Sequence, residues 1–586
     1  MGTRQLIQVG KWVVDSAAGW IRLSGEKEET HIRPKLMDVL TLLVQAKGKV
    51  VTRRDLLFQG WPETLASDES LTRCISDLRK LFGDDGKGTA IIKTIPKRGY
   101  RIDCSVIEEI PQPVDVAYQV QRSSKCAIIV LPFSVMHDKA QSEYLAEGIS
   151  EDILSLLSRA PDLRVIAKPS AFSFKGRSDP EEITRHLNVD YILNGFISGS
   201  KSELELTLDL MNTKSMQIVW HRSLKFQMNE IQALQGEVAA TIMEHIGVSV
   251  PQGLPAKESV DPQVYMLMLQ GRHLANLVTP EGWKQSNEHF RKVLVIDPEY
   301  ADAWAGLAKN YAFHACDGLR SFQEGFTLAR ASVNRALGVD SRCSMALAMD
   351  GWLRLYESFD HQASAESFEK ALALDPFNTD TLLDVAHLTR AMGRLEVATR
   401  LCKFVVSRDP VNAKAYRDLG IFQRVQGDSE LAAGTFKTML ALSPGISSGQ
   451  TLLGFVLNEM GRSEAALAAV EKESSEIWQL IGLSMINFTL NQRGQSDAAL
   501  QKLIAKFEFP AAYNIAYVEA FRGNSDQAFH WLQKARKYGD PGIAHFVTEK
   551  YFANIQNDKR WTTLLEQTGQ SPEKLAKIKL DILIPE

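Results

Sequence analysis

Apolar residues recur along residues 69–82 at the spacing of a helix with one buried stripe. The stripe consists of Leu71, Ile75, Leu78 and Phe82, separated by four, three and four positions. Residues 83–86, Gly-Asp-Asp-Gly, end this helix, and two short β-type runs follow at 90–95 and 100–102. Between the runs lies a basic tip, Pro96-Lys97-Arg98-Gly99. The pattern therefore predicts a helix followed by a β-hairpin.

The region before this helix predicts a small antiparallel sheet and two further helices. Glycines divide residues 5–33 into short β-type runs at 5–9, 12–15, 20–23 and 30–33. A helix over 33–44 has the core stripe Leu36, Val39, Leu40, Leu43 and Val44. A second helix starts at Arg53 with Thr52 as its cap and runs to about residue 58, before the Gln-Gly-Trp-Pro break at 59–62.

The polar face of the helix at 69–82 suits DNA recognition. It carries side chains that donate hydrogen bonds to phosphates and base edges in the major groove: Thr72, Arg73, Ser76, Arg79 and Lys80. The helix ending in Leu78-Arg79-Lys80 and the hairpin ending in Gly99-Tyr100-Arg101 resemble the C-terminal effector domain of OmpR/PhoB-type winged-helix regulators. An ordinary amphipathic helix with a surface hairpin is the alternative. The resemblance implies a winged helix-turn-helix domain over residues 1–106 that binds double-stranded promoter DNA.

On this interpretation the candidate DNA-binding residues divide into two groups. We expect base-edge contacts from Thr72, Arg73 and Ser76, and phosphate contacts from Arg79, Lys80, Lys97, Arg98 and Arg101. We expect Tyr100 in the core of the wing. Asp77 departs from the basic or neutral pattern: it either accepts from a cytosine amine or pairs with Arg73 or Arg101, and the sequence does not decide between these.

The charge distribution agrees with a DNA-binding N-terminus. The whole chain has a formal net charge of −4, but residues 1–105 hold 18 Lys/Arg and 13 Asp/Glu, a net charge of +5. The remaining residues carry a net charge of −9. The basic excess therefore lies in the candidate DNA reader, and we expect the rest of the chain not to bind nucleic acid.

Residues 107–124 contain two prolines and few apolar residues, which predicts a linker to a second domain over 125–250. The order of its predicted elements is β-α-β-α-β-β-β, starting from the all-apolar run at 127–131. Leu131-Pro132-Phe133, residues 144–149 and residues 189–195 resemble the TolB-like N-terminal domain. Ligand sensing would use loop residues after the first two strands: His137, Asp138, Lys168, Ser170, Ser173 and Lys175. We find no phosphate cradle, metal-spaced histidines or nucleophile elbow, so we expect no enzyme activity.

From about residue 261 a repeat with a period of 34 residues appears. Gly393, Gly427 and Gly461 recur at this spacing, and so do Pro376, Pro410 and Pro444. Small residues recur where paired helices must approach closely: Gly420, Gly454, Ala398, Ala432, Ala466 and Ala499. Thirty-four residues is the tetratricopeptide period, so we expect an all-α solenoid over 261–586, with seven or eight helical pairs to Lys537 and a cap from 561 to 584. Its groove is expected to bind a protein or peptide partner; a spacer or self-association role is the alternative.

Other features exclude several classes of protein. There is no apolar run of 18 residues and no signal sequence, which predicts a cytoplasmic protein without membrane contact. The six cysteines are scattered without CxxC spacing, so we expect no disulfide, metal or cofactor. Only Cys74 lies in a functional element, where a redox switch is the alternative.

The order of domains is multidomain α and α/β: winged helix, TolB-like α/β domain, tetratricopeptide solenoid. This order resembles bacterial one-component regulators of the invasion-gene activator (HilA-like) type, and residues 69–75 resemble that group most closely. The resemblance implies a transcriptional activator that binds direct-repeat promoter DNA as a homodimer, contacts RNA polymerase, and is controlled by its C-terminal domains rather than a receiver domain. The rival hypothesis is a tetratricopeptide scaffold or sensor whose DNA-binding domain is degenerate; Asp77 and the short wing favour it.

Overall fold

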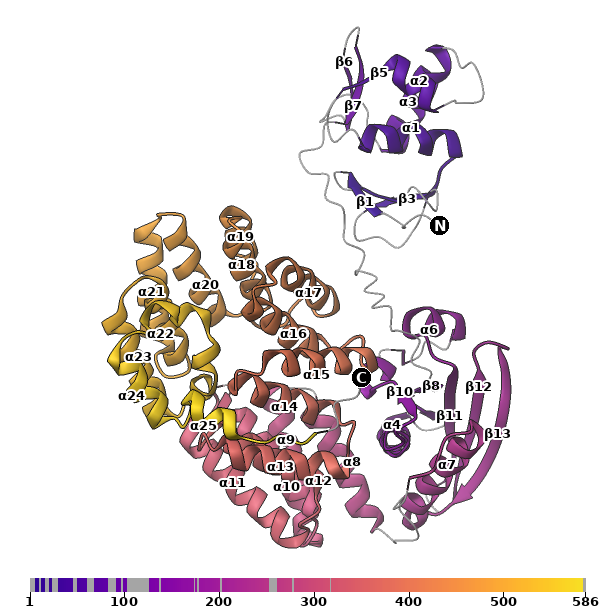
Figure 1. Cartoon of the computed structure of the whole chain (residues 1–586). Helices are drawn as coiled ribbons and strands as arrows, with labels where there is room; N and C mark the ends of the chain where they lie inside the picture. Colours follow the sequence, from indigo (N-terminus) through magenta and orange to yellow (C-terminus); the bar gives the residue numbers. More distant parts are fainter. Residues whose placement is uncertain are drawn as a thin grey trace. The chain divides into compact units, whose positions relative to one another are not determined.

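The computed structural model divides the chain into two compact units, Met1–Gln119 and Val120–Glu586 (Figure 1). The residues that it describes are 6–9, 12–15, 20–23, 30–45, 50–60, 68–82, 91–95, 98–102, 126–135, 139–172, 174–175, 179–200, 203–251, 261–276, 279–316 and 318–582.

The described residues of the first unit form two small sheets and three helices. The pattern predicts the first sheet, the three helices and the hairpin, and the structure adds a third strand, Val51–Thr52, to the hairpin. One sheet is antiparallel and has the order β1-β2-β3-β4, with strands Leu6–Val9, Trp12–Asp15, Trp20–Leu23 and Thr30–His31. The second has the order β5-β7-β6, with strands Val51–Thr52, Gly99–Ile102 and Ile92–Ile95. The helices are α1 (Pro34–Gln45), α2 (Arg53–Gly60) and α3 (Asp68–Leu81).

The predicted apolar stripes form the core of this unit. Leu71, Ile75 and Leu78 of α3 are at most 1% exposed, and the five stripe residues of α1 are also buried. Phe82, the last stripe residue, packs edge-on against Trp12 with 5.7 Å between ring centroids. Thr52 caps α2 as expected, because its hydroxyl oxygen accepts the Asp55 N–H at 3.1 Å. The helix α2 runs to Gly60, two residues further than predicted.

The wing joins the rest of this unit through a close backbone contact at Gly99. Antiparallel pairing places Thr52 of β5 opposite Gly99 of β7. A Cβ atom at residue 99 would lie 1.9 Å from the carbonyl oxygen of Val51 and 2.9 Å from the Thr52 Cα. Only glycine allows the strands to approach this closely.

The second unit begins with an α/β domain. Its sheet has the order β10-β8-β11-β12-β13, and β9 also pairs with β11. β8 pairs in parallel with β10 and β11, whereas β12 is antiparallel to both of its neighbours. The strands are β8 (Cys126–Val130), β9 (Ser134–Val135), β10 (Leu163–Val165), β11 (Tyr191–Ser200), β12 (Glu203–Asn212) and β13 (Gln217–Phe226).

The helices of this domain include two that the sequence analysis did not assign. The expected helices are α4 (Lys139–Ser158) and α6 (Pro180–Leu187). The additional ones are α5 (Lys168–Phe172) and α7 (Ile231–His245), the latter preceded by the short turn η1 (Met228–Glu230). The predicted all-apolar strand is confirmed, because Ile128, Ile129 and Val130 of β8 are fully buried.

Eight helical pairs follow among the described residues, in agreement with the repeat count. The period is visible in the backbone: Gly393, Gly427 and Gly461 all have positive φ angles of 75–94° at the turns between paired helices. The pairs are α8/α9 (Pro262–Asn276, Pro280–Ile296), α10/α11 (Ala301–Cys316, Phe322–Val339), α12/α13 (Ser344–Tyr356, His361–Leu374), α14/α15 (Thr379–Ala391, Leu395–Arg408), α16/α17 (Ala413–Gln426, Ser429–Leu442), α18/α19 (Gly449–Glu459, Ser463–Val470), α20/α21 (Glu476–Thr489, Arg493–Phe507) and α22/α23 (Ala512–Phe521, Ser525–Tyr538).

Small residues allow the paired helices to interlock, as the sequence predicted. A Cβ at Gly420 of α16 would lie 2.5 Å from the Phe436 ring of α17. Likewise, a Cβ at Gly454 of α18 would lie 2.7 Å from the Val470 side chain. The recurring alanines at 398, 432, 466 and 499 are all buried. The array ends in η2 (Pro541–Thr548), η3 (Lys550–Ile555), α24 (Lys559–Gln567) and α25 (Pro572–Lys577).

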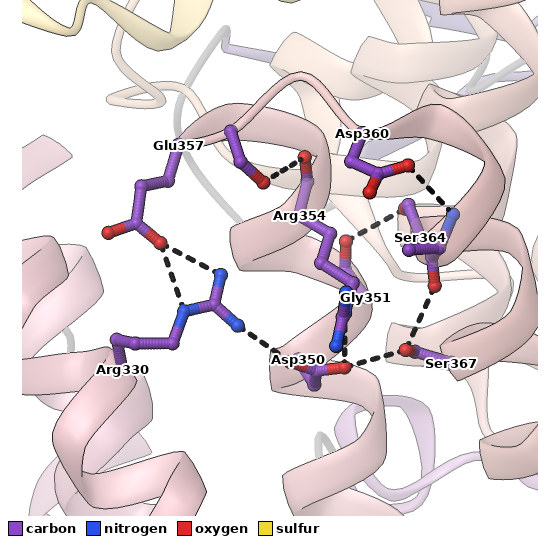
Figure 2. A network of polar contacts seen from close by, with 10 residues as sticks. Arg330, Asp350, Gly351, Arg354, Glu357, Asp360, Ser364 and Ser367 are labelled. Carbon is purple, nitrogen blue, oxygen red and sulfur yellow. Dashed lines mark hydrogen bonds and ion pairs between the residues drawn. The ribbon is translucent and has the colours of Figure 1, made fainter.

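A buried carboxylate links three successive helices of the array. Figure 2 shows Asp350 of α12 accepting hydrogen bonds from Arg330 of α11, Arg354 of its own helix and Ser367 of α13, each at 2.6 Å. The Arg330 guanidinium also binds Glu357 through Nε and Nη2, at 3.0 and 2.8 Å. Because every charge in this network is paired, the polar groups do not oppose packing between the second and third helical pairs.

The α/β domain is attached to the repeats at two places. Next to it in sequence, Asp152 of α4 accepts from Tyr265 and Arg272 of α8, at 2.8 and 3.0 Å. Far from it in sequence, the buried Ser170 hydroxyl donates to Asp409 at 2.5 Å, and the Ala167 N–H donates to the Arg408 carbonyl at 2.9 Å. Ser170, a candidate ligand residue in the sequence analysis, therefore joins two parts of the fold.

We predict that Gly99→Ala destabilises the wing. The added methyl group would overlap the Val51 carbonyl, and overpacking of this kind costs about 1–3 kcal/mol. Hydrogen exchange of the β5 and β7 amides should accelerate, while exchange in the repeats stays unchanged. Unchanged exchange in both strands would show that the wing accommodates the added methyl group without loss of stability, and would contradict the prediction.

We also predict that Ser170→Ala loosens the contact between the α/β domain and α15–α16. The substitution removes one donor to a buried carboxylate, which costs about 1–3 kcal/mol. The amides at 409–412 should exchange faster. Ser158→Ala is the matched control, because that hydroxyl only donates to Leu154 of its own helix. Equal effects of the two substitutions would contradict this role for Ser170.

Candidate nucleic-acid interface

The helix α3 presents the predicted polar face to solvent. Burial of Leu71, Ile75 and Leu78 on one side fixes the rotation of the helix about its axis. As a result the residues on the opposite side are exposed: Thr72, Arg73, Ser76 and Lys80. These four residues form a surface of hydroxyl, guanidinium and ammonium donors that can reach base edges and phosphates.

Arg79 has a different environment from the other cations of α3. Its Nε and Nη2 donate to the Ile92 carbonyl of β6 at 3.1 and 2.8 Å, and Nη2 also donates to the Thr94 hydroxyl at 2.9 Å. These bonds use Nε and Nη2 of the guanidinium and connect the helix to the wing. The sequence analysis assigned Arg79 to phosphate contact; in the structure its side chain also links α3 to β6.

Asp77 has a partner that the sequence analysis did not consider. The Arg33 Nη2 atom, just before α1, donates to the Asp77 carboxylate at 2.9 Å. The ion pair compensates the negative charge beside the DNA-facing donors, and the Arg33 side chain remains 74% exposed. Asp77 is therefore weak evidence for a degenerate DNA-binding domain.

The described part of the wing tip offers an exposed cation. Arg98 lies between β6 and β7, exposed, and its N–H donates to the Ile95 carbonyl at 3.0 Å. Arg101 of β7 is half-buried. Lys97, the third cation predicted for the hairpin, lies outside the described residues.

Tyr100 belongs to the core of the wing, as expected. Its side chain is 3% exposed, and its hydroxyl accepts a hydrogen bond from Arg53 of α2 at 2.7 Å. The Arg53 guanidinium also lies over the tyrosine ring, 5.2 Å from its centroid. This contact ties the wing to α2. Sequence reasoning missed Arg53 because its partner is 47 residues away and no local pattern pairs them.

Cys74 is a poor candidate for a redox switch. It lies on the inner side of α3 at 8% exposure. Burial, followed by the negative charge of Asp77, raises the pKa of the thiol above its usual value. The reactive thiolate is therefore disfavoured.

The described residues contain no helix long and apolar enough to cross a membrane. Nor do they bring together three His, Cys, Asp or Glu side chains in a group that could hold a metal ion.

Comparison with known families identifies two regions of the chain. Residues 27–102 match the family "Transcriptional regulatory protein, C terminal", and residues 124–241 match "HilA/YgeH-like transcriptional regulator, second domain". The first match contains every candidate DNA-binding residue. The second covers most of the α/β domain, which the sequence analysis had compared with TolB-like domains.

Three curated proteins illustrate the similarity. The transcriptional regulator HilA of Salmonella typhi is 26% identical over 361 residues, 60% of this chain and 62% of HilA. The transcriptional activator CadC of Escherichia coli is 31% identical over 103 residues, 17% of this chain and 20% of CadC. A Rhizobium meliloti protein named "Putative adenylate cyclase 3" is 30% identical over 193 residues, 32% of this chain and 33% of that protein.

The chain thus spans about 62% of the length of the HilA relative. Residues 27–102 form an OmpR/PhoB-type C-terminal winged-helix DNA-binding domain, and residues 124–241 form a HilA-type second domain. Tetratricopeptide-like helices follow. Over 60% of its length the chain is similar to the regulator HilA, at 26% identity.

Proposed function

We propose that this protein is a transcriptional regulator that binds promoter DNA through α3 and the wing. The observation that supports this most directly is the exposed donor face of α3, held opposite a fully buried stripe in a domain of the OmpR/PhoB type. The helix would lie in the major groove and the β6–β7 hairpin in the adjacent minor groove.

The exposed residues have different roles in this proposal. Thr72, Arg73 and Ser76 read base edges from the exposed face of α3. Phosphates are bound by Lys80, Lys97, Arg98 and Arg101. Arg79 acts as a positioning residue, because its guanidinium already binds the backbone of β6 and the Thr94 hydroxyl.

The remaining parts of the proposal concern assembly and control. Two copies bind a direct-repeat site, with one α3 in each half-site, and roughly six to ten phosphate contacts make the affinity fall steeply with salt. HilA is named a transcriptional regulator and CadC a transcriptional activator, which supports an activating role. We propose contact with RNA polymerase as the route of activation. The second unit controls this activity by binding a protein or peptide. These steps take place in the cytoplasm.

Selection of binding sites from a random DNA pool by the full-length protein tests the proposal. Enrichment of a tandem motif supports a DNA-reading regulator. Failure to enrich any motif, together with a protein partner bound by the repeats, favours the scaffold hypothesis.

We predict that Arg73→Ala and Arg98→Ala have different effects on DNA binding. Loss of a bidentate base contact by Arg73 should weaken binding to the selected site by about 1–3 kcal/mol and relax base preference at one position. Loss of Arg98 should weaken binding to selected and random DNA alike and reduce the salt slope by about one. Fluorescence anisotropy at several salt concentrations measures both, and identical patterns for the two variants would contradict this division of roles.

A further inference from the structure

After the last helical pair, the chain turns back and crosses the first helices of earlier pairs. η2 packs against α12, α14 and α22, and η3 packs against α22. In the same segment, Glu549 pairs with Arg424 of α16, and Lys550 pairs with Glu459 of α18. A segment of fifteen residues, Pro541–Ile555, thus touches five of the eight first helices. These first helices form the face of the array that the segment covers.

The segment is embedded in this face. Ile543, Ala544, Phe546 and Phe552 are fully buried, and Ile555 is 1% exposed. A Cβ at Gly542 would lie 2.4 Å from the Tyr513 ring of α22, so the backbone of the segment approaches the helix closely. Residues 541–555 therefore cover apolar surface that the array would otherwise expose.

A buried carboxylate anchors the middle of the segment. Glu549 lies 3.9 Å from an Arg390 nitrogen of α14 and 3.6 Å from an Arg424 nitrogen of α16. All three side chains are at most 10% exposed. Arg390 also donates to the Thr548 hydroxyl at 3.2 Å. Two buried cations on the array thus meet one carboxylate from the segment.

An aromatic site lies beside this anchor. The Tyr551 hydroxyl donates to Glu459 of α18 at 3.0 Å. Its ring lies 5.7 Å from the Phe455 ring, 5.4 Å from Phe521 and 5.8 Å from Tyr517. The array therefore receives a carboxylate and, two residues later, an aromatic ring.

We propose that this face of the repeat array binds a peptide that presents a carboxylate and, two residues later, an aromatic ring, and that residues 541–555 occupy the site as a built-in competitor. A partner of the same chemistry enters only by displacing this segment from Arg390, Arg424 and the ring cluster. The proposal deepens the partner-binding part of the proposed function. Its test does not involve DNA, so its failure is distinguishable from failure of DNA recognition.

Hydrogen exchange of the full-length protein tests whether the segment is anchored as proposed. The Glu549→Gln variant removes the charge that faces Arg390 and Arg424, and exchange within residues 541–555 should become on the order of 100-fold faster. Glu573→Gln is the matched control, because Glu573 lies exposed on α25. Equal protection in the two variants would overturn the anchor.

A labelled synthetic peptide with the sequence of residues 541–555 tests the site itself. It should bind the Glu549→Gln variant at least tenfold more tightly than the parent, whose site is filled by a tethered competitor. The same peptide with Gln in place of Glu549 should bind the variant about tenfold more weakly than the unmodified peptide. Equal binding to parent and variant, or equal binding of both peptides, would contradict the proposal.

Acidification of the parent protein gives an independent measurement. His545 Nε2 lies 3.2 Å from the Tyr356 hydroxyl of α12, and its Nδ1 has no hydrogen-bond partner among the described residues. The titratable and charged groups that face its ring are Tyr356 of α12, His361 of α13, His387 and Arg390 of α14, and Asp418 of α16. Burial, followed by the Arg390 charge, holds the pKa of His545 well below its usual value.

The sign of the pH effect follows from this lowered pKa. The released segment takes up a proton below about pH 6.5 and the docked segment does not, so docking is complete above that pH and weakens below it. As the pH falls below about 6.5, hydrogen exchange of residues 541–555, corrected for the intrinsic exchange rate, should become about tenfold faster for each pH unit. In His545→Gln this dependence on pH should be lost. A parent slope equal to that of His545→Gln would contradict release of the segment by protonation.

Discussion

The second unit depends on close contact between paired helices, which requires small residues at fixed positions. Gly420 receives the ring of Phe436, and Gly351 of α12 receives the ring of Phe368 in the same way. Each pair buries only part of its apolar surface, so the next pair must cover the rest. This requirement repeats every 34 residues and explains why small residues recur along the array with that period.

Close packing also determines where polar groups can exist in the array. Asp350 is buried, yet three donors satisfy its carboxylate. Glu549 is buried between two arginines that come from different helical pairs. Such groups stabilise only the arrangement in which all partners are present, and they make that arrangement specific. The contacts therefore hold residues 541–555 against the array in one defined arrangement.

Close packing also determines the geometry of the smaller DNA-binding unit. Burial of the α3 stripe forces the donor face outward, and the pairing of β5 with β7 through Gly99 fixes the start of the wing. Arg79 and Arg53 then connect α3 and α2 to the wing. Two cations of a basic domain thus support the geometry of the interface, while Arg73, Lys80 and Arg98 remain exposed on it.

The sequence by itself determined the features that depend on local periodicity: the buried stripes of α1 and α3, the small strands, the wing and the 34-residue repeat. These features could be read because a single helix or hairpin reveals them. Only the tertiary structure decided which polar and charged side chains pair with each other. Arg33 reaches Asp77 across 44 residues, and Ser170 reaches Asp409 across 239. The same holds for the segment that fills the face of the repeats. Partners so far apart leave no periodic signal, because their contact is created by the packing of whole elements rather than by spacing along the chain.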